Sequence, residues 1–209
     1  MSSTARMLAE THRMIQRISL LAVVLIAGCS TPAHRSHVAP HPQATESLRG
    51  PGPYTFDCDA PAGKADSRNI KIPSGNLRVT GLLQILTARK DDLFQASAGI
   101  ELVAPEVSAA AALQLLVRHE DPSKVFVAFG TASEQPEANV FTSMPLTSEP
   151  TPFALTVDRS GTITGSFGGV ASPQPLRFSG ATYLAIGCST ARVRFSNVTF
   201  EKRTRAVEH

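Results

Sequence analysis

The chain has 209 residues, which suits one domain of ordinary size together with additional segments. Charged residues make up 18% of the sequence and aromatic residues 6%, with no Trp, and this composition excludes a coiled coil, a polytopic membrane protein and a wholly disordered chain. The formal net charge of +3 is too balanced to predict nucleic-acid binding, so no nucleic-acid partner is expected.

The first 28 residues have the pattern of an export signal. The basic residues Arg6, Arg13 and Arg17 precede the apolar run 18–28. This run is much shorter than the about 20 apolar residues that a spanning helix requires, so it fits a signal-peptide core. Met14 is an alternative start that would give a shorter basic region.

The end of the apolar run, Ile26-Ala27-Gly28-Cys29, resembles the lipobox of bacterial lipoproteins. The resemblance implies that the Cys29 thiol carries a diacylglyceryl group and that the chain is cleaved before Cys29 and acylated there. Several acyl chains then form a durable membrane anchor. Ser30 after the cysteine favours the outer membrane of a bacterial envelope, facing the periplasm. The alternative is an ordinary cleaved signal with an unmodified cysteine.

Cleavage before Cys29 also changes the charge balance. It removes three arginines and Glu10, which lowers the formal charge from +3 to +1. The apparent basicity of the chain therefore belongs largely to the signal.

Residues 29–53 predict a disordered tether, because the segment is rich in proline and lacks an apolar period. It also carries His34, His37 and His41, which could bind a divalent transition metal. A polar spacer is the favoured interpretation, because a flexible segment has no surrounding groups to fix the ligand geometry. We therefore predict no metal site and no cofactor.

Residues 54–202 predict one domain of short strands, followed by a basic tail over 203–209. Apolar residues alternate from Leu77 to Ile85. Residues 125–129 form another short strand pattern, and the segment 109–116 favours a strand over a helix because its leucines alternate.

Two further features of this region predict turns within a sheet. The segment 153–167 predicts a hairpin in which Gly161 supplies a positive φ after Asp158. Val198 and Phe200 fall out of phase with the apolar residues before them, so a bulge is expected at Ser196-Asn197.

Two cysteines remain in the domain, Cys58 and Cys188. An even pair in an exported chain predicts a disulfide, here closing a loop of about 130 residues. Such a bond requires the first and last strands of the domain to lie close together. The alternative is two buried free thiols.

The order of these segments resembles the concanavalin A-like lectin and glucanase family, including laminin G-like domains. The resemblance is carried by residues 54–57, 75–81, 153–165 and 191–200. It implies an all-β, antiparallel two-sheet jelly-roll sandwich in which the first and last strands are neighbours in one sheet. That arrangement agrees with the proposed Cys58–Cys188 bond.

Catalytic residues are not predicted. Glucanases of this family carry a Glu-x-Asp-x-x-Glu motif on one strand, and the sequence has no such run. Glu101 and Glu106 are separated by Pro105 and point to no common face. His119, the only histidine of the domain, is linked by no motif to a nucleophile.

Candidate ligand-binding residues are planar hydrogen-bonding side chains that could line a concave sheet face. The alternative is that they belong to a solvated face, and Tyr183 in particular to the sheet itself. The candidates are Arg78, Gln84, Arg177, Tyr183, Arg192 and Arg194.

The sequence therefore predicts a lipid-anchored envelope protein with a non-catalytic binding or scaffolding module. Its expected partners are the membrane, through the N-terminal lipid, and a glycan or an envelope protein. The alternatives are a structural lipoprotein without a small ligand and a glycan-processing enzyme of the same fold.

Overall fold

The computed structural model of the chain describes residues 46–47, 52–104, 109–131, 139–178 and 180–202. The chain divides into two units, Met1–Arg35 and Ser36–His209, and all described residues belong to the second. The predictions for the export signal, for Cys29, for the three tether histidines, for Glu106 and for the tail 203–209 lie outside the described residues.

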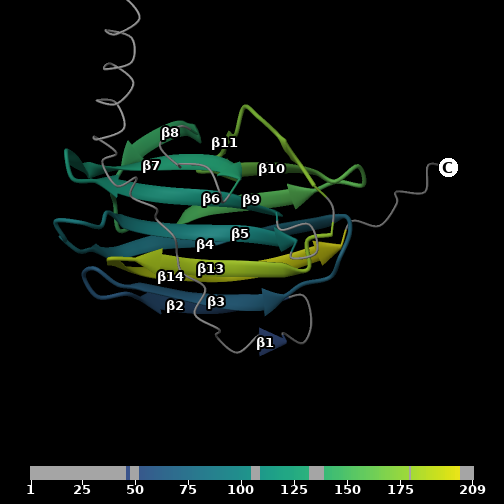
Figure 1. Cartoon of the computed structure of the whole chain (residues 1–209), viewed down its shortest axis with the longest axis horizontal. Helices are drawn as coiled ribbons and strands as arrows, with labels where there is room; N and C mark the ends of the chain where they lie inside the picture. Colours follow the sequence, from purple (N-terminus) through teal and green to yellow (C-terminus); the bar gives the residue numbers. More distant parts are fainter. Residues whose placement is uncertain (1–45, 48–51, 105–108, 132–138, 179, 203–209) are drawn as a thin grey trace, which may run out of the picture. The chain divides into compact units, whose positions relative to one another are not determined.

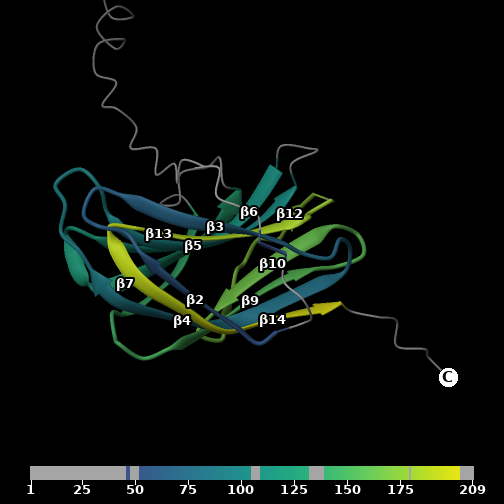
Figure 2. The ribbon, with the colours of Figure 1, turned by 90° about the horizontal axis from the view of Figure 1, so that it is seen from below.

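The described part is a sandwich of two β-sheets without an α-helix (Figure 1). Figure 2 shows the two layers edge-on, with β3, β13 and β5 in the upper layer and β2, β4 and β14 in the lower one. Every pairing between described strands is antiparallel except that of β1 with β3. The predicted all-β, antiparallel two-sheet sandwich is confirmed.

Sheet A contains seven strands, among them the consecutive strands β5 to β8. In spatial order they are β1 (Glu46–Ser47), β3 (Ala65–Lys71), β13 (Tyr183–Ser189), β5 (Ala96–Ala104), β6 (Ala109–Arg118), β7 (Asp121–Thr131) and β8 (Val140–Pro145).

Sheet B contains the first long strand and the last strand of the domain, which lie side by side as predicted. In spatial order its strands are β11 (Val170–Ala171), β10 (Thr162–Phe167), β9 (Thr151–Val157), β4 (Leu77–Ala88), β14 (Ala191–Lys202) and β2 (Tyr54–Asp59), with β12 (Leu176–Arg177) paired to β10.

The core lies between the inner faces of the two sheets. Apolar and polar residues alternate along β4 and β5, so that every second side chain is buried. Leu77, Val79 and Leu83 of β4 face Ile100 and Leu102 of β5 within one hydrophobic cluster. A fully buried side chain of this kind contributes about 1.5–3 kcal/mol to folding, so the alternation itself selects the two-layer arrangement.

The β9–β10 hairpin has the predicted turn. Gly161 has a φ of 76°, and the Asp158 carboxylate accepts hydrogen bonds from the backbone N–H groups of Ser160 and Thr162 at 2.8 and 2.9 Å. Within β10, a Cβ atom at Gly165 would lie 2.6 Å from the ring of Phe129 in sheet A. A glycine there lets the aromatic ring of one sheet approach the backbone of the other.

Two more local predictions are confirmed. The alanine-rich segment forms strand β6 between β5 and β7. The register of β14 shifts between Phe195 and Val198, and Asn197 has a φ of 52°, so a bulge restores the apolar phase at Ser196-Asn197.

The segment predicted to be an irregular tether contains one short strand. Glu46 and Ser47 pair in parallel with Ile70 and Lys71 of β3. Strand β3 borders sheet A on this side, and its outer backbone groups would otherwise lack partners. Because pairing with these groups requires only backbone hydrogen bonds, a polar segment can pair with β3 although its composition carries no strand pattern.

The predicted disulfide joins Cys58 of β2 to Cys188 of β13, with 6.0 Å between the two Cα atoms. Because β2 belongs to sheet B and β13 to sheet A, the bond links the two layers. Both cysteines are buried.

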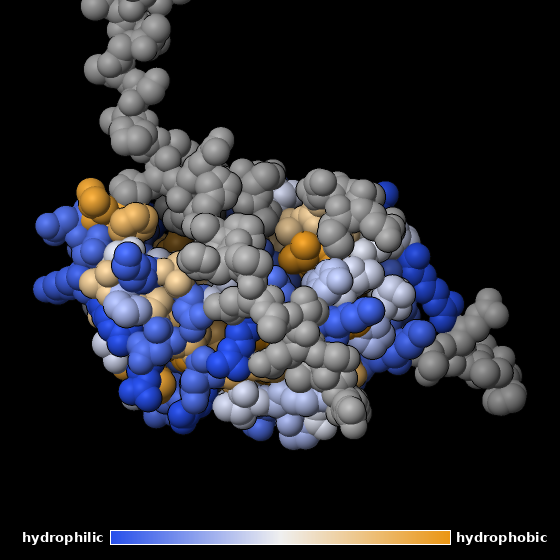
Figure 3. All heavy atoms as spheres, turned by 60° about the horizontal axis from the view of Figure 1, so that its bottom comes forward, coloured by the Kyte–Doolittle hydropathy of each residue, from blue (hydrophilic) through white to orange (hydrophobic). Residues whose placement is uncertain are grey.

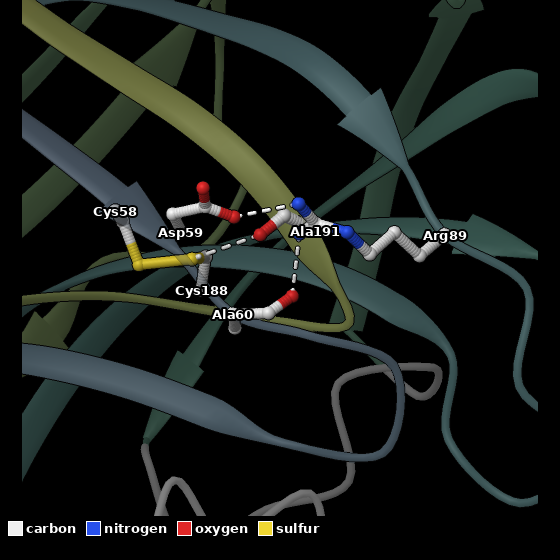
Figure 4. A network of polar contacts seen from close by, with 6 residues as sticks. All are labelled: Cys58, Asp59, Ala60, Arg89, Cys188 and Ala191. Atoms are coloured by element: carbon white, nitrogen blue, oxygen red, sulfur yellow. Dashed lines mark hydrogen bonds and ion pairs between the residues drawn. A yellow bond between two sulfur atoms is a disulfide. The ribbon is translucent and has the colours of Figure 1, made fainter.

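Polar contacts surround the disulfide in a region that we call the braced end, consisting of Cys58, Asp59, Ala60, Arg89, Cys188 and Ala191 (Figure 4). The Arg89 guanidinium donates hydrogen bonds to the carbonyl of Ala60 and to the carboxylate of Asp59, each at 2.6 Å. The sulfur of Cys188 lies 3.4 Å from the carbonyl oxygen of Ala191.

Replacing both Cys58 and Cys188 by alanine should lower the free energy of unfolding by about 3–5 kcal/mol, because the bond closes a loop with a sequence separation of 130 residues. Urea denaturation of the variant and of the reduced parent protein measures this loss. An unchanged denaturation midpoint after full reduction would contradict the assigned role of the bond.

Candidate functional site

The outer face of sheet B carries four of the six predicted ligand-binding residues, spread along β4 and β14. Arg78 and Gln84 lie on β4, and Arg192 and Arg194 lie on β14, each between neighbours that point into the core. In the pairing of β14 with β4, Arg194 lies directly opposite Gln84.

The other two predicted residues lie elsewhere. Arg177 is on β12 at the border of sheet B, opposite Thr162. Tyr183 is on β13 in sheet A, so it shares no sheet with the four residues above. Alternation along each strand shows which side chains share a face of that strand, but it cannot assign the strand to a sheet.

Arg194 forms an ion pair with Asp57 on the neighbouring strand β2. The Arg194 Nε–Asp57 Oδ1 distance is 2.8 Å, and the Nη2–Oδ2 distance is 3.3 Å. The hydrogen bond from Arg194 lowers the pKa of Asp57, against the smaller opposing effect of burial. The guanidinium is therefore occupied within the sheet, and because both groups are exposed the pair adds little to stability.

Gln84 also has a structural partner. Its side-chain amide donates a hydrogen bond to the carbonyl of Ser148 at 2.6 Å. This contact fixes the loop between β8 and β9 against sheet B. Gln84 and Arg194 therefore use their main hydrogen-bonding groups within the protein and do not offer them to a ligand.

Arg78 lines a hollow on the outer face of sheet B, which we call the sheet B hollow. Its volume is about 420 Å³. Its outward-facing lining comes from β4, β9, β10, the turn after β10 and the β14 bulge. These lining residues are Arg78, Thr80, Leu82, Pro152, Ala154, Ser166, Gly169 and Asn197.

The lining combines an apolar floor with separate polar groups. Leu82, Pro152 and Ala154 supply the floor, and the register places Leu82 directly opposite Pro152. Arg78 and Asn197 contribute a guanidinium and a side-chain amide. Such a combination of apolar contact and a few hydrogen-bonding groups is typical of small-molecule sites.

Arg78 differs from Arg194 in having no ion pair, and from Arg192 in lining the hollow. No hydrogen bond or ion pair joins Arg78 to another described residue, although Glu201 and Thr156 are its cross-strand neighbours. Thr80, beside it, exchanges a hydrogen bond of 2.8 Å with Thr199. The donors of Arg78 are therefore available to a ligand, whereas the Thr80 hydroxyl already has a partner.

Glu101 is a notable polar residue for which the sequence analysis proposed no role. It lies on the outward side of β5, directly opposite Ala185 of β13 and Ala112 of β6. Burial raises the pKa of its carboxyl group. No hydrogen bond or ion pair joins it to another residue of the described ranges. In the sequence, the only indication of this residue is a single carboxylate in an apolar strand, next to an alanine-rich segment.

The acidic residues near the disulfide are paired with arginines. Asp57 contacts Arg194, and the Asp59 carboxylate lies 2.6 Å from Arg89.

Within the described ranges, no group of three His, Cys, Asp or Glu side chains is arranged to hold a metal ion. The same ranges contain no helix of sufficient length and hydrophobicity to cross a bilayer.

No protein-family model matches the chain, and no curated protein matches it. Several solved structures are similar in fold. An alginate lyase from Pseudomonas aeruginosa is 15% identical, with a TM-score of 0.43, over 62% of this chain and 66% of the lyase. The chain thus spans slightly less than two thirds of that enzyme.

Two further structures have comparable scores. The carbohydrate-binding module CBM66 from Bacillus subtilis is 9% identical, with a TM-score of 0.43, over 76% of this chain and 99% of the module. The β-glucanase of Bacillus licheniformis is also 9% identical, with a TM-score of 0.43, over 71% of this chain and 78% of the enzyme.

Glu101→Gln should stabilise the protein more at pH 7 than at pH 4. A raised pKa means that the folded state binds this proton more readily than the unfolded state, so the parent protein loses stability as the pH rises above the ordinary carboxyl range. Glutamine keeps the shape without the charge. Urea denaturation at both pH values measures the effect, with Glu120→Gln as the exposed control. Equal stabilisation at the two pH values would contradict it.

Proposed function

We propose that this protein is a lipid-anchored envelope protein whose β-sandwich binds a glycan, without catalysis, at the sheet B hollow. The observation that carries the proposal is Arg78, whose guanidinium has no partner among the described residues and borders an open hollow of about 420 Å³. A binding function accounts for this arrangement, whereas Arg194 of the same face is explained by its ion pair with Asp57, and Arg192 lies outside the hollow.

The lining has the chemistry that a sugar ring requires. The C–H face of a pyranose can pack on Leu82 and Pro152, which provide an apolar surface without an aromatic ring. Arg78 can donate two parallel hydrogen bonds to neighbouring hydroxyl groups or to a carboxylate. The side chains of Ser166 and Asn197 offer further donors and acceptors on other sides of the hollow.

A non-catalytic role is supported by the carboxylates of sheet B. Hydrolysis of a glycosidic bond by the usual route requires two carboxyl groups about 5–9.5 Å apart beside the substrate. The lining of the hollow contains no carboxylate. Asp57 and Asp59, on β2, are engaged by Arg194 and Arg89.

Anchoring is the second part of the proposal. It is supported by the resemblance of residues 26–29 to a lipobox and by the proline-rich composition of residues 30–53. A Cys29-linked lipid would hold the sandwich on the periplasmic side of the outer membrane. There the hollow would meet envelope glycans as partners.

Arg78→Ala should weaken glycan binding by about tenfold or more, because a hydrogen bond to a charged group contributes about 1.5–3 kcal/mol. Screening of the full chain on a glycan array, followed by calorimetry with the best ligand, measures the change. Arg192→Ala is the matched control, since it removes an exposed arginine from the same face outside the hollow. Equal losses in the two variants, or no glycan bound by the parent protein, would overturn the proposal.

Cys29→Ser should abolish lipid attachment, because the thiol that accepts the diacylglyceryl group is absent. Membrane fractionation and mass analysis of the cellular protein measure the outcome. The variant is expected to be unprocessed or to lose its acyl chains. An acylated, correctly cleaved variant would contradict anchoring at this position.

A further inference from the structure

The sheet B hollow contains a single charged side chain. Hydrophilic residues make up most of the described surface visible in Figure 3, so an exposed charge by itself is ordinary on this protein. Arg78 stands out because every other residue that lines the hollow is uncharged. No hydrogen bond or ion pair joins its guanidinium to another residue of the described ranges. The hollow therefore carries a positive charge that no lining group balances.

Two carboxylates lie near Arg78 in the sheet, and neither forms an ion pair with it among the described contacts. Glu201 of β14 is its cross-strand neighbour and has an exposed side chain. Asp158 directly follows β9. Its carboxylate accepts hydrogen bonds from the backbone N–H groups of Ser160 and Thr162, so it is used within the hairpin turn.

The acidic residues of β2 are too far away to balance this charge. Asp57 lies opposite Arg194, which in turn lies opposite Gln84 of β4. Gln84 is six residues from Arg78 along the strand, a distance of about 20 Å. The Debye length at physiological ionic strength is about 8 Å, so solvent ions screen charges at this separation.

The neutral hydrogen-bonding groups flank the apolar floor of the hollow. Asn197 lies in the bulge of β14 on one side of β4, and Ser166 lies on β10 on the other side of β9. Gly169, in the turn after β10, has a φ of 84°, and a Cβ atom there would meet nothing within 4 Å, so a ligand can approach its backbone closely.

Arg78 lies at one end of the hollow. Along β4 the lining extends from Arg78 to Leu82, which are four residues or about 13 Å apart. A ligand that covers this length is longer than one sugar ring. It would pack on the apolar floor near Leu82, bond to the neutral groups at both sides, and place a further group at the guanidinium.

We infer that the glycan bound in the sheet B hollow carries a carboxylate, and that Arg78 binds this carboxylate. The inference rests on the proposed function, because it concerns the same site. A guanidinium and a carboxylate form two parallel hydrogen bonds, each about twice as strong as one between neutral groups. A neutral sugar leaves the charge of Arg78 unbalanced, whereas a uronic acid or a similar acidic sugar supplies one opposite charge.

The same charge count favours a carboxylate over a phosphate group. A phosphate monoester carries a charge of about −1.5 to −2 at pH 7, and the lining offers only one cation to balance it. Glu201, opposite Arg78, would repel the excess negative charge. A carboxylate carries a single charge, which one guanidinium neutralises.

A glycan array with neutral, uronic-acid-containing and phosphorylated glycans tests the inference on the full chain. The uronic-acid glycans should bind most tightly. Reduction of the carboxylate of the best ligand to an alcohol should weaken binding by about tenfold or more in calorimetry, because a hydrogen-bonded charge pair is lost. The preference for the acidic form should also decrease as salt is added, since Arg78 is exposed.

The Arg78→Gln variant assigns this preference to one side chain. It should bind the acidic and the reduced ligand with nearly equal affinity, because glutamine keeps hydrogen-bond donors and lacks the charge. Arg192→Gln is the matched control, since it removes an arginine of the same face outside the hollow, and it should keep the preference of the parent protein. Urea denaturation verifies that both variants are folded.

The outcomes separate this inference from the proposed function. Tightest binding of neutral or phosphorylated glycans would overturn the inference and leave glycan binding intact. An unchanged preference for the acidic form in Arg78→Gln would overturn the assignment to Arg78 in the same way. If the parent protein bound no glycan at all, the proposed function would fail, and the inference with it.

Discussion

The disulfide between Cys58 and Cys188 restricts how the two sheets of this domain can move relative to each other. It joins sheet B to sheet A through β2 and β13, at the end where the loops carrying Ala60 and Arg89 and the turn at Thr190 meet. The hydrophobic core holds the faces of the two sheets together, but a core alone tolerates some sliding between layers. A covalent link beside buried hydrogen bonds restricts such sliding, and it gives one end of the sandwich a fixed set of loops.

The strands themselves could be predicted because a sheet with one buried face produces alternating apolar and polar residues in the sequence. The alternation in β4, the turn at Gly161 and the phase change at Asn197 each follow from local rules of backbone and burial. The pairing of Glu46 with Ile70 could not be predicted, since it depends on unpaired backbone groups of an edge strand and not on the side chains of the paired segment.

The candidate site was predictable only in part, for a related reason. Arg78, Gln84 and Arg194 were correctly assigned to one side of their strands, but the sequence contains no information on their partners. The structure pairs Arg194 with Asp57 and Gln84 with Ser148, residues 137 and 64 positions away. The sequence cannot separate Tyr183 from these residues, because strand order within sheets depends on long-range pairing. It predicts no role for Glu101, because an isolated carboxylate matches no motif.

The close approach of Phe129 to Gly165 has a consequence for how this fold can vary. The aromatic ring from sheet A occupies the space that any side chain at position 165 would need. The two positions are therefore coupled in volume, although 36 residues separate them in the chain. A chain of this fold with a larger residue at the position of Gly165 would be expected to carry a smaller one in place of Phe129, so substitutions at these two positions should occur together.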